Sequence, residues 1–138
     1  MPRKMVICMN IVLDTNVLVS ALWSANSKPA MILNYVLSGR YIPCHDFRII
    51  EEYNCVLHRP KFGFSNWEIE YLLEPILKNG ISVIPKALPE VPFTDKSDRK
   101  FLEVAKFCGA YLITGNIKYY PADPCVITVS DFYEQYCK

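Results

Sequence analysis

The chain has 138 residues, of which 51% are hydrophobic and 21% are charged, and its formal net charge is +1. This length and composition are typical of one folded domain and exclude an intrinsically disordered chain. The near-zero charge does not indicate a nucleic-acid partner, so such a partner has to be bound by a local basic patch. Because no apolar run reaches the roughly 18 residues that a membrane span needs, the sequence predicts no membrane association.

Apolar segments of two different periods alternate along the chain. Residues 5–13 are almost continuously apolar and end at Asp14, which predicts a strand buried on both faces. Thr15 or Asn16 is expected to cap a helix that begins at Val17. The other expected helices are 29–37, 47–57, 65–78, 97–108 and a last one from Asp131, and the other expected strands are 41–44, 81–84, 110–114 and 126–129.

The alternation of strands and helices predicts a fold of the α/β class, a three-layer α/β/α sandwich with a central, mainly parallel sheet. We expect one domain over residues 1–138, with 1–8 as an N-terminal extension if Met9 is the true start. Functional sites in such sheets lie at the carboxyl ends of the strands. Asp14 follows one predicted strand, and Asn116 follows another, so both are candidates for that edge.

Helical periodicity brings two more acids towards the same region. At 100° per residue, Glu51 in the 47–57 helix faces water, whereas Glu52 lies at the border of the apolar stripe. In the 97–108 helix, Asp98 lies on the inward stripe with Phe101. The sequence therefore places Asp14, Glu52 and Asp98 at inward or strand-end positions.

Each of these acids also has a purely structural interpretation. Asp14 suits a cap or a turn, and Asp95 with Asp98 is typical of a capping box at a helix start. Three unpaired carboxylates at one edge would repel one another and raise each other's pKa. A hard cation such as Mg²⁺ or Mn²⁺ relieves this repulsion, and it can activate water and neutralise charge on a phosphodiester.

Four segments in this order carry a family resemblance: "LDTNVLVSAL", "IIEEYNCVLHRPKFG", "DKSDRKFLEVAKFCGAYLITGN" and "DFYEQY". Together they resemble the PIN-domain family of metal-dependent ribonucleases over nearly the whole chain. The set is most similar to the branch whose members serve as toxins of toxin–antitoxin pairs. No single segment is specific, but the ordered set is.

The resemblance implies a catalytic set of four positions, of which three are metal ligands. The ligands are Asp14, Glu52 and Asp98, and the fourth catalytic position is Asn116. Many family members carry an acid at this fourth position, whereas an Asn offers a carbonyl oxygen without charge. The resemblance also implies supporting roles for Asn16, Asp95 and Thr114.

Cofactor and partners follow from the same resemblance. It implies Mg²⁺ or Mn²⁺ as cofactor, single-stranded RNA as substrate, an antitoxin protein as partner, and a homodimer. Arg99, Lys100 and Lys118 are candidate RNA-binding residues, and Tyr119 and Tyr120 are candidates for base stacking. The alternative for these side chains is a solvated surface for the cations and a core position for the tyrosines.

The chain has six cysteines, most of them in apolar segments. We expect free thiols and a cytoplasmic protein. Zinc binding by Cys44, His45, Cys55 and His58 fits no common ligand spacing. The main alternative function is a catalytically weak PIN-fold module that binds RNA or protein, which Asn116 favours. A flap-type DNA nuclease is disfavoured because the chain has no room for long arch insertions.

Overall fold

A single parallel sheet organises the protein. The computed structural model describes residues 8–88, 93 and 95–138. Its strands are β1 (Met9–Leu13), β2 (Tyr41–His45), β3 (Ile81–Ser82), β4 (Tyr111–Thr114) and β5 (Val126–Thr128). They form one sheet in the order β3-β2-β1-β4-β5, and every neighbouring pair is parallel.

Six α-helices and three short 3-10 helices connect the strands in the described part of the chain. The α-helices are α1 (Thr15–Trp23), α2 (Lys28–Leu37), α3 (Phe47–Leu57), α4 (Asn66–Asn79), α5 (Arg99–Cys108) and α6 (Val129–Tyr136). The 3-10 helices are η1 (Pro60–Phe62), η2 (Lys96–Asp98) and η3 (Ile117–Tyr119). No helix of the described residues is long and apolar enough to cross a membrane.

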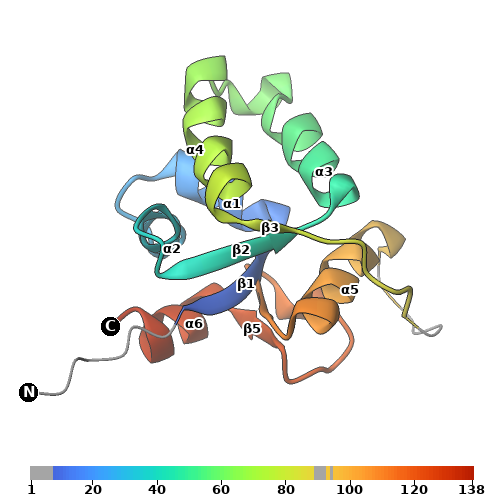
Figure 1. Ribbon diagram of the computed structural model, residues 1–138. Coiled ribbons are helices and arrows are strands. Elements are labelled where there is room, and N and C mark those ends of the chain that lie inside the picture. Colours follow the sequence, from blue (N-terminus) through green and yellow to red (C-terminus); the bar gives the residue numbers. More distant parts are fainter. Residues whose placement is uncertain (1–7, 89–92, 94) are drawn as a thin grey trace, which may run out of the picture.

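The helices cover both faces of the sheet. In Figure 1 the strands run from β3 at the top to β5 at the bottom, with α2 and α6 to their left and α5 to their right. The ring of Phe132 on α6 packs against Tyr41 and Tyr111, whereas α5 contacts the opposite face, where Asn10 donates to the Cys108 carbonyl. β1 is the central strand, and its Ile11, Val12 and Leu13 are at most 1% exposed. A strand covered on both faces has to be continuously apolar, which explains the sequence pattern before Asp14. The predicted three-layer α/β/α sandwich is confirmed.

Several predicted boundaries were wrong by a few residues. Helix α1 begins at Thr15 instead of Val17, because Asp14 is its N-cap. The predicted 97–108 helix begins as the 3-10 turn η2 and becomes α-helical only at Arg99. Strand β3 is limited to Ile81–Ser82. Residues 5–7 of the first predicted strand lie outside the described residues.

The register of β1 against β4 determines which side chains meet at the sheet edge. Leu13 is paired with Ile113, and the backbone N–H of Asp14 donates to the Ile113 carbonyl at 3.0 Å. The residue that follows this pair is therefore Asp14 after β1 and Thr114 in β4. Parallel strands keep their carboxyl ends together, so residues 100 apart in sequence become neighbours here.

Candidate functional site

Asp14 is the most strongly fixed acid of this edge. Its side chain caps α1 by accepting from the Asn16 backbone N–H at 3.5 Å. Its Oδ2 accepts hydrogen bonds from the Thr114 hydroxyl at 2.9 Å and from the Tyr120 hydroxyl at 2.8 Å. The residue is only 5% exposed. These contacts hold the carboxylate in one orientation at the end of a rigid strand.

Tyr120 has a different place from the one that the sequence suggested. It is 7% exposed and its hydroxyl donates to Asp14, so its ring is not available for base stacking. The stacking prediction for Tyr120 was therefore wrong, whereas Tyr119 is 43% exposed. No local signal distinguishes the two tyrosines, because the contact of Tyr120 with Asp14 spans 106 residues.

The ionised form of Asp14 is disfavoured in the folded chain. Burial raises the pKa of Asp14 above its ordinary value, and the charge of Glu52 raises it further. The hydrogen bonds from Tyr120 and Thr114 act in the opposite direction without cancelling the effect of burial. A cation close to Asp14 would stabilise the charged form that the protein alone penalises.

Asn16 connects α1 to the turn that follows β4. Its Oδ1 accepts a hydrogen bond from the Gly115 backbone N–H at 3.0 Å. A Cβ atom at position 115 would lie 3.2 Å from that oxygen, so glycine permits the close approach. Asn16 therefore supports the site by fixing the Gly115 turn against the start of α1.

Glu52 enters the site from α3. It is half-buried whereas its neighbour Glu51 is exposed, as the helical phase predicts. One carboxylate oxygen, Oε2, accepts a hydrogen bond from the Thr15 hydroxyl. The other, Oε1, lies 2.7 Å from the Lys100 ammonium, whose side chain is 11% exposed. Lys100 thus supplies a cation inside the acidic site, which sequence periodicity did not indicate.

Asp98 contributes the third carboxylate from the end of η2. It forms no side-chain cap hydrogen bond to α5, so the capping box expected from the sequence is not formed. Asp95 instead caps η2 by accepting from the Ser97 backbone N–H at 2.9 Å, which lowers its pKa. Burial raises the pKa of Asp98 to about 6, and the charges of Asp14, Asp95 and Glu52 raise it too. The three predicted acids are thus close enough to interact electrostatically.

Asn116 lies beside these acids and has a local structural role. Its side-chain oxygen accepts from the Lys118 backbone N–H at 3.1 Å and caps η3. Its own N–H donates to the Thr114 hydroxyl at 3.1 Å, and the same hydroxyl donates to Asp14. Asn116 is therefore connected to Asp14 through Thr114.

The donor set fits a hard divalent cation that keeps part of its water. Among the described residues, no three His, Cys, Asp or Glu side chains converge closely enough to hold one ion. Mg²⁺ needs only one or two carboxylates when waters or phosphates fill its other positions. Asp14 and Asp98 offer such oxygens, and the pKa of each is raised mainly by burial and further by neighbouring carboxylates.

Of the predicted basic residues, Arg99 and Lys100 are neighbours at the start of α5, but they have different partners. Arg99 donates to the Leu88 carbonyl, and Lys100 pairs with Glu52. Lys118 is exposed on η3, on the other side of the Asn116 turn. Within the described part of the chain, Lys100 is the one cation that forms an ion pair with Asp14, Glu52 or Asp98.

The raised pKa of Asp98 predicts how the stability of the metal-free protein depends on pH. The folded pKa of about 6 exceeds the ordinary 3.8, so this group stabilises the fold at low pH and loses that contribution as pH rises through about 6. In EDTA, Asp98→Asn should match the parent at pH 4 and exceed its unfolding free energy by about 1 kcal/mol at pH 8, after allowance for solvent screening. Urea denaturation at both pH values measures this difference.

A matched control is Asp95→Asn, because the pKa of Asp95 is lowered by its hydrogen bond from Ser97. The stabilisation that a lowered pKa gives is nearly complete by pH 4, so this variant should differ from the parent by nearly the same amount at pH 4 and at pH 8. The same pH trend in both variants would contradict the placement of Asp98 among like charges.

The Lys100–Glu52 pair predicts that Lys100 competes with a metal. Replacing Lys100 with Met removes a positive charge 2.7 Å from a carboxylate oxygen of Glu52. Mn²⁺ binding should tighten by about tenfold, which corresponds to about 1.4 kcal/mol. Calorimetric titration measures the change, with Lys106→Met as control because Lys106 pairs with Asp123 instead. Unchanged affinity in the Lys100 variant would place the metal away from Glu52.

Comparison with known proteins identifies the family. The model of the PIN domain matches residues 10–118, a segment that contains Asp14, Glu52, Asp98 and Asn116. Comparison with curated proteins and with solved structures gives no significant match. PIN domains are generally nucleases, and they typically use divalent metals. Since the match covers well over half of the chain and the parallel sheet agrees with it, the protein belongs to the PIN-domain family.

Proposed function

We propose that the protein is a metal-dependent endoribonuclease that cleaves single-stranded RNA. One observation carries the proposal: Asp14, Glu52 and Asp98 come from three separate elements, and the charges of Asp14 and Glu52 add to the effect of burial in raising the pKa of Asp98. Carboxylates whose pKa is raised by burial and by neighbouring acids are often found at functional sites. Membership of a family of nucleases supports the same function.

The residues of the chain divide into ligands and positioning groups. Asp14 and Asp98 would hold Mg²⁺ or Mn²⁺, with Glu52 joining them when Lys100 moves from its carboxylate. The bound metal would supply an activated water and neutralise charge on the phosphodiester. Thr114 and Tyr120 orient Asp14 by donating to the same oxygen, and Thr15 orients Glu52. Asn116 positions Thr114 through its backbone N–H.

Cleavage of a mixed pool of labelled single-stranded RNAs tests the function. The protein is incubated with Mn²⁺, with Mg²⁺ and with excess EDTA, and products are separated on a denaturing gel. We expect internal cleavage with either metal and none in EDTA, with little cutting of a perfectly paired duplex. Cleavage that persists in EDTA would exclude metal dependence, and equal cutting of single-stranded DNA would exclude RNA specificity.

We further propose that this nuclease is the toxin of a toxin–antitoxin pair and acts in the cytoplasm, as the ordered motifs suggest. Induced expression in a bacterial host should then stop growth, and Asp14→Asn should relieve the arrest at equal protein level. Co-expression of a small neighbouring gene should relieve it too. Growth that is unaffected by the active nuclease would remove the toxin role without affecting the nuclease proposal.

A second candidate function is a PIN-fold module with weak or no catalysis that binds RNA or protein. Two observations favour it: Asn116 brings no charge where many relatives have an acid, and Lys100 already neutralises Glu52. Calorimetric titration with Mn²⁺ discriminates the two. Binding below about 1 mM that disappears in Asp14→Asn supports the nuclease. Absent binding, together with unchanged RNA affinity in EDTA, supports the module.

A further inference from the structure

A groove of about 490 Å³ adjoins the carboxylate site between α3 and the η2–α5 turn. Glu52 and Lys100 line both the groove and the site, so the two are continuous. The groove is unusually basic, because five cationic side chains line it against two acids. The cationic residues are Arg48, Arg59, Lys96, Arg99 and Lys100.

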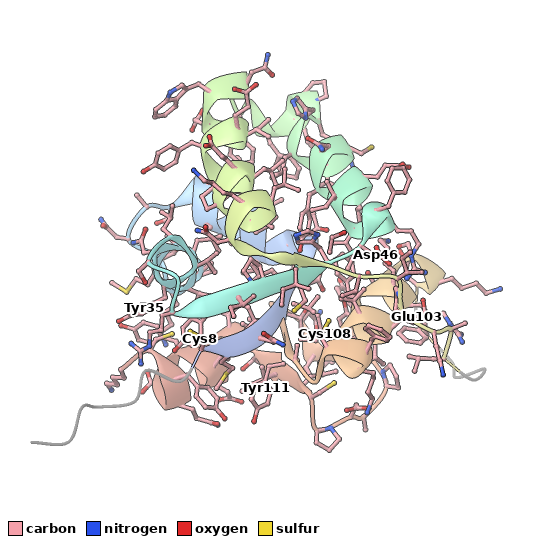
Figure 2. All side chains as sticks on the ribbon, in the orientation of Figure 1. Cys8, Tyr35, Asp46, Glu103, Cys108 and Tyr111 are labelled. Atoms are coloured by element: carbon pink, nitrogen blue, oxygen red, sulfur yellow. The ribbon has the colours of Figure 1, made fainter. Side chains whose placement is uncertain are left out.

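Part of this positive charge is already compensated within the protein. Arg48 forms ion pairs with Asp46 at 2.7 Å and with Glu103 at 2.8 Å, and Figure 2 shows these two acids together at the edge formed by α3 and α5. Arg59 and Lys96 are exposed, and neither forms an ion pair within the described residues. These two cations stand on opposite walls, one at the end of α3 and one in η2.

An exposed aromatic ring lies on the same wall as α3. Phe47, the first residue of this helix, is 77% exposed and lines the groove. The ring therefore offers an accessible apolar face beside the cations of the groove. Every nucleobase has a flat π-face that can stack on such a ring, and the stacking requires an unpaired base.

We infer that this groove binds single-stranded RNA as the strand leaves the carboxylate site, with Arg59 and Lys96 on phosphates and Phe47 against a base. The identity of the strand as RNA rests on the proposed function. An acidic protein segment would use the cations but has no need for an exposed ring beside an acidic catalytic edge. Lys118 does not line the groove, so its predicted contact with RNA stays a separate prediction.

The proposal gives the two kinds of contact different signatures in one binding assay. The Asp14→Asn protein is titrated with a fluorescein-labelled eight-nucleotide oligoadenylate at several salt concentrations, and anisotropy is recorded. Adding Arg59→Gln with Lys96→Gln should lower the slope of log K against log salt by about 1.4, since each phosphate contact on a single strand contributes about 0.7. Adding Phe47→Ala should weaken binding about tenfold and leave the slope unchanged.

Two controls make the assay specific. Lys28→Gln with Lys78→Gln removes the same charge on α2 and α4, away from the groove, and should leave the slope nearly unchanged. Phe47→Trp should restore or exceed the parental affinity, because tryptophan also stacks. Thermal melts of each variant verify that the fold is intact.

The outcomes separate this inference from the proposed function. Equal slope losses in the groove pair and the control pair would overturn it, as would unchanged affinity in Phe47→Ala. Displacement of the oligonucleotide by polyglutamate at equal charge, with no effect of Phe47→Ala, would indicate an acidic protein partner instead and also overturn it. If the wild type binds through the groove but never cleaves, the nuclease proposal fails and the groove stands.

Discussion

Replacing Asp14 with Asn is expected to reduce metal-dependent RNA cleavage by about 10³-fold or more. Asp14 is the acid that the fold orients most firmly, with hydroxyl donors from Thr114 and Tyr120 on one oxygen. A neutral amide removes one negative charge from the metal site. Charge stabilisation by a metal contributes several kcal/mol to a transition state, and each 1.4 kcal/mol corresponds to about a factor of ten in rate.

Single-turnover cleavage with saturating protein and Mn²⁺ measures this effect. Asn remains a good helix cap and the hydroxyls of Thr114 and Tyr120 can reorient, so the unfolding free energy should change by about 1 kcal/mol or less. Asp131→Asn is a suitable control, because Asp131 is an exposed acid in the first turn of α6. Retention of more than a tenth of the parental rate by Asp14→Asn would show that the reaction does not depend on this carboxylate.

Replacing Glu103 with Gln is expected to lower the unfolding free energy by about 2 kcal/mol, because it removes a buried carboxylate that binds Arg48 and the Leu88 backbone N–H. Glu103 lies on α5 and is 4% exposed. Its Oε1 accepts from Arg48 at 2.8 Å, and its Oε2 accepts from the Leu88 backbone N–H at 3.0 Å. One carboxylate thus connects α5 to α3 and to the backbone of Leu88.

Urea denaturation in EDTA measures this loss, so that metal binding does not contribute. Glu70→Gln changes the same chemistry at an exposed position of α4 and should stay within about 0.5 kcal/mol of the parent. A Glu103→Gln variant as stable as this control would mean that Arg48 and Leu88 find other partners at little cost. In the metal-free state Asp14→Asn and Glu103→Gln should therefore differ clearly in stability.

Most of the fold could be predicted from the sequence because its signals are local. The apolar run before Asp14 gave a buried strand, Ser65 gave a helix start, and the periodicity of 47–57 gave α3 with the observed bounds. The errors occur at the ends of elements, where a capping side chain or a 3-10 turn determines the boundary. Helix α1 starts two residues early because Asp14 caps it, and η2 replaces the first turn of the predicted 97–108 helix.

The candidate site could be predicted only in part. Helical phase distinguished the half-buried Glu52 from the exposed Glu51, and strand ends located Asp14 and Asn116, which are connected through Thr114. The contacts of Lys100 with Glu52 and of Tyr120 with Asp14 could not be found in this way. They join residues 48 and 106 positions apart, and a periodic pattern carries no information about which distant side chains meet. The proposed roles of all these residues stay predictions.

The pairing of β1 with β4 also has a consequence for the order in which the protein is made. Asp14 lies near the beginning of the chain, whereas its partners Thr114 and Tyr120 lie in the last fifth. During translation the chain grows from its amino end, so a ribosome-bound segment that stops before residue 114 contains Asp14 without the hydroxyls that orient it. The central strand likewise has no β4 neighbour until then. Assembly of the carboxylate edge therefore has to wait until β4 has been made, and a growing chain that still lacks β4 has no completed site.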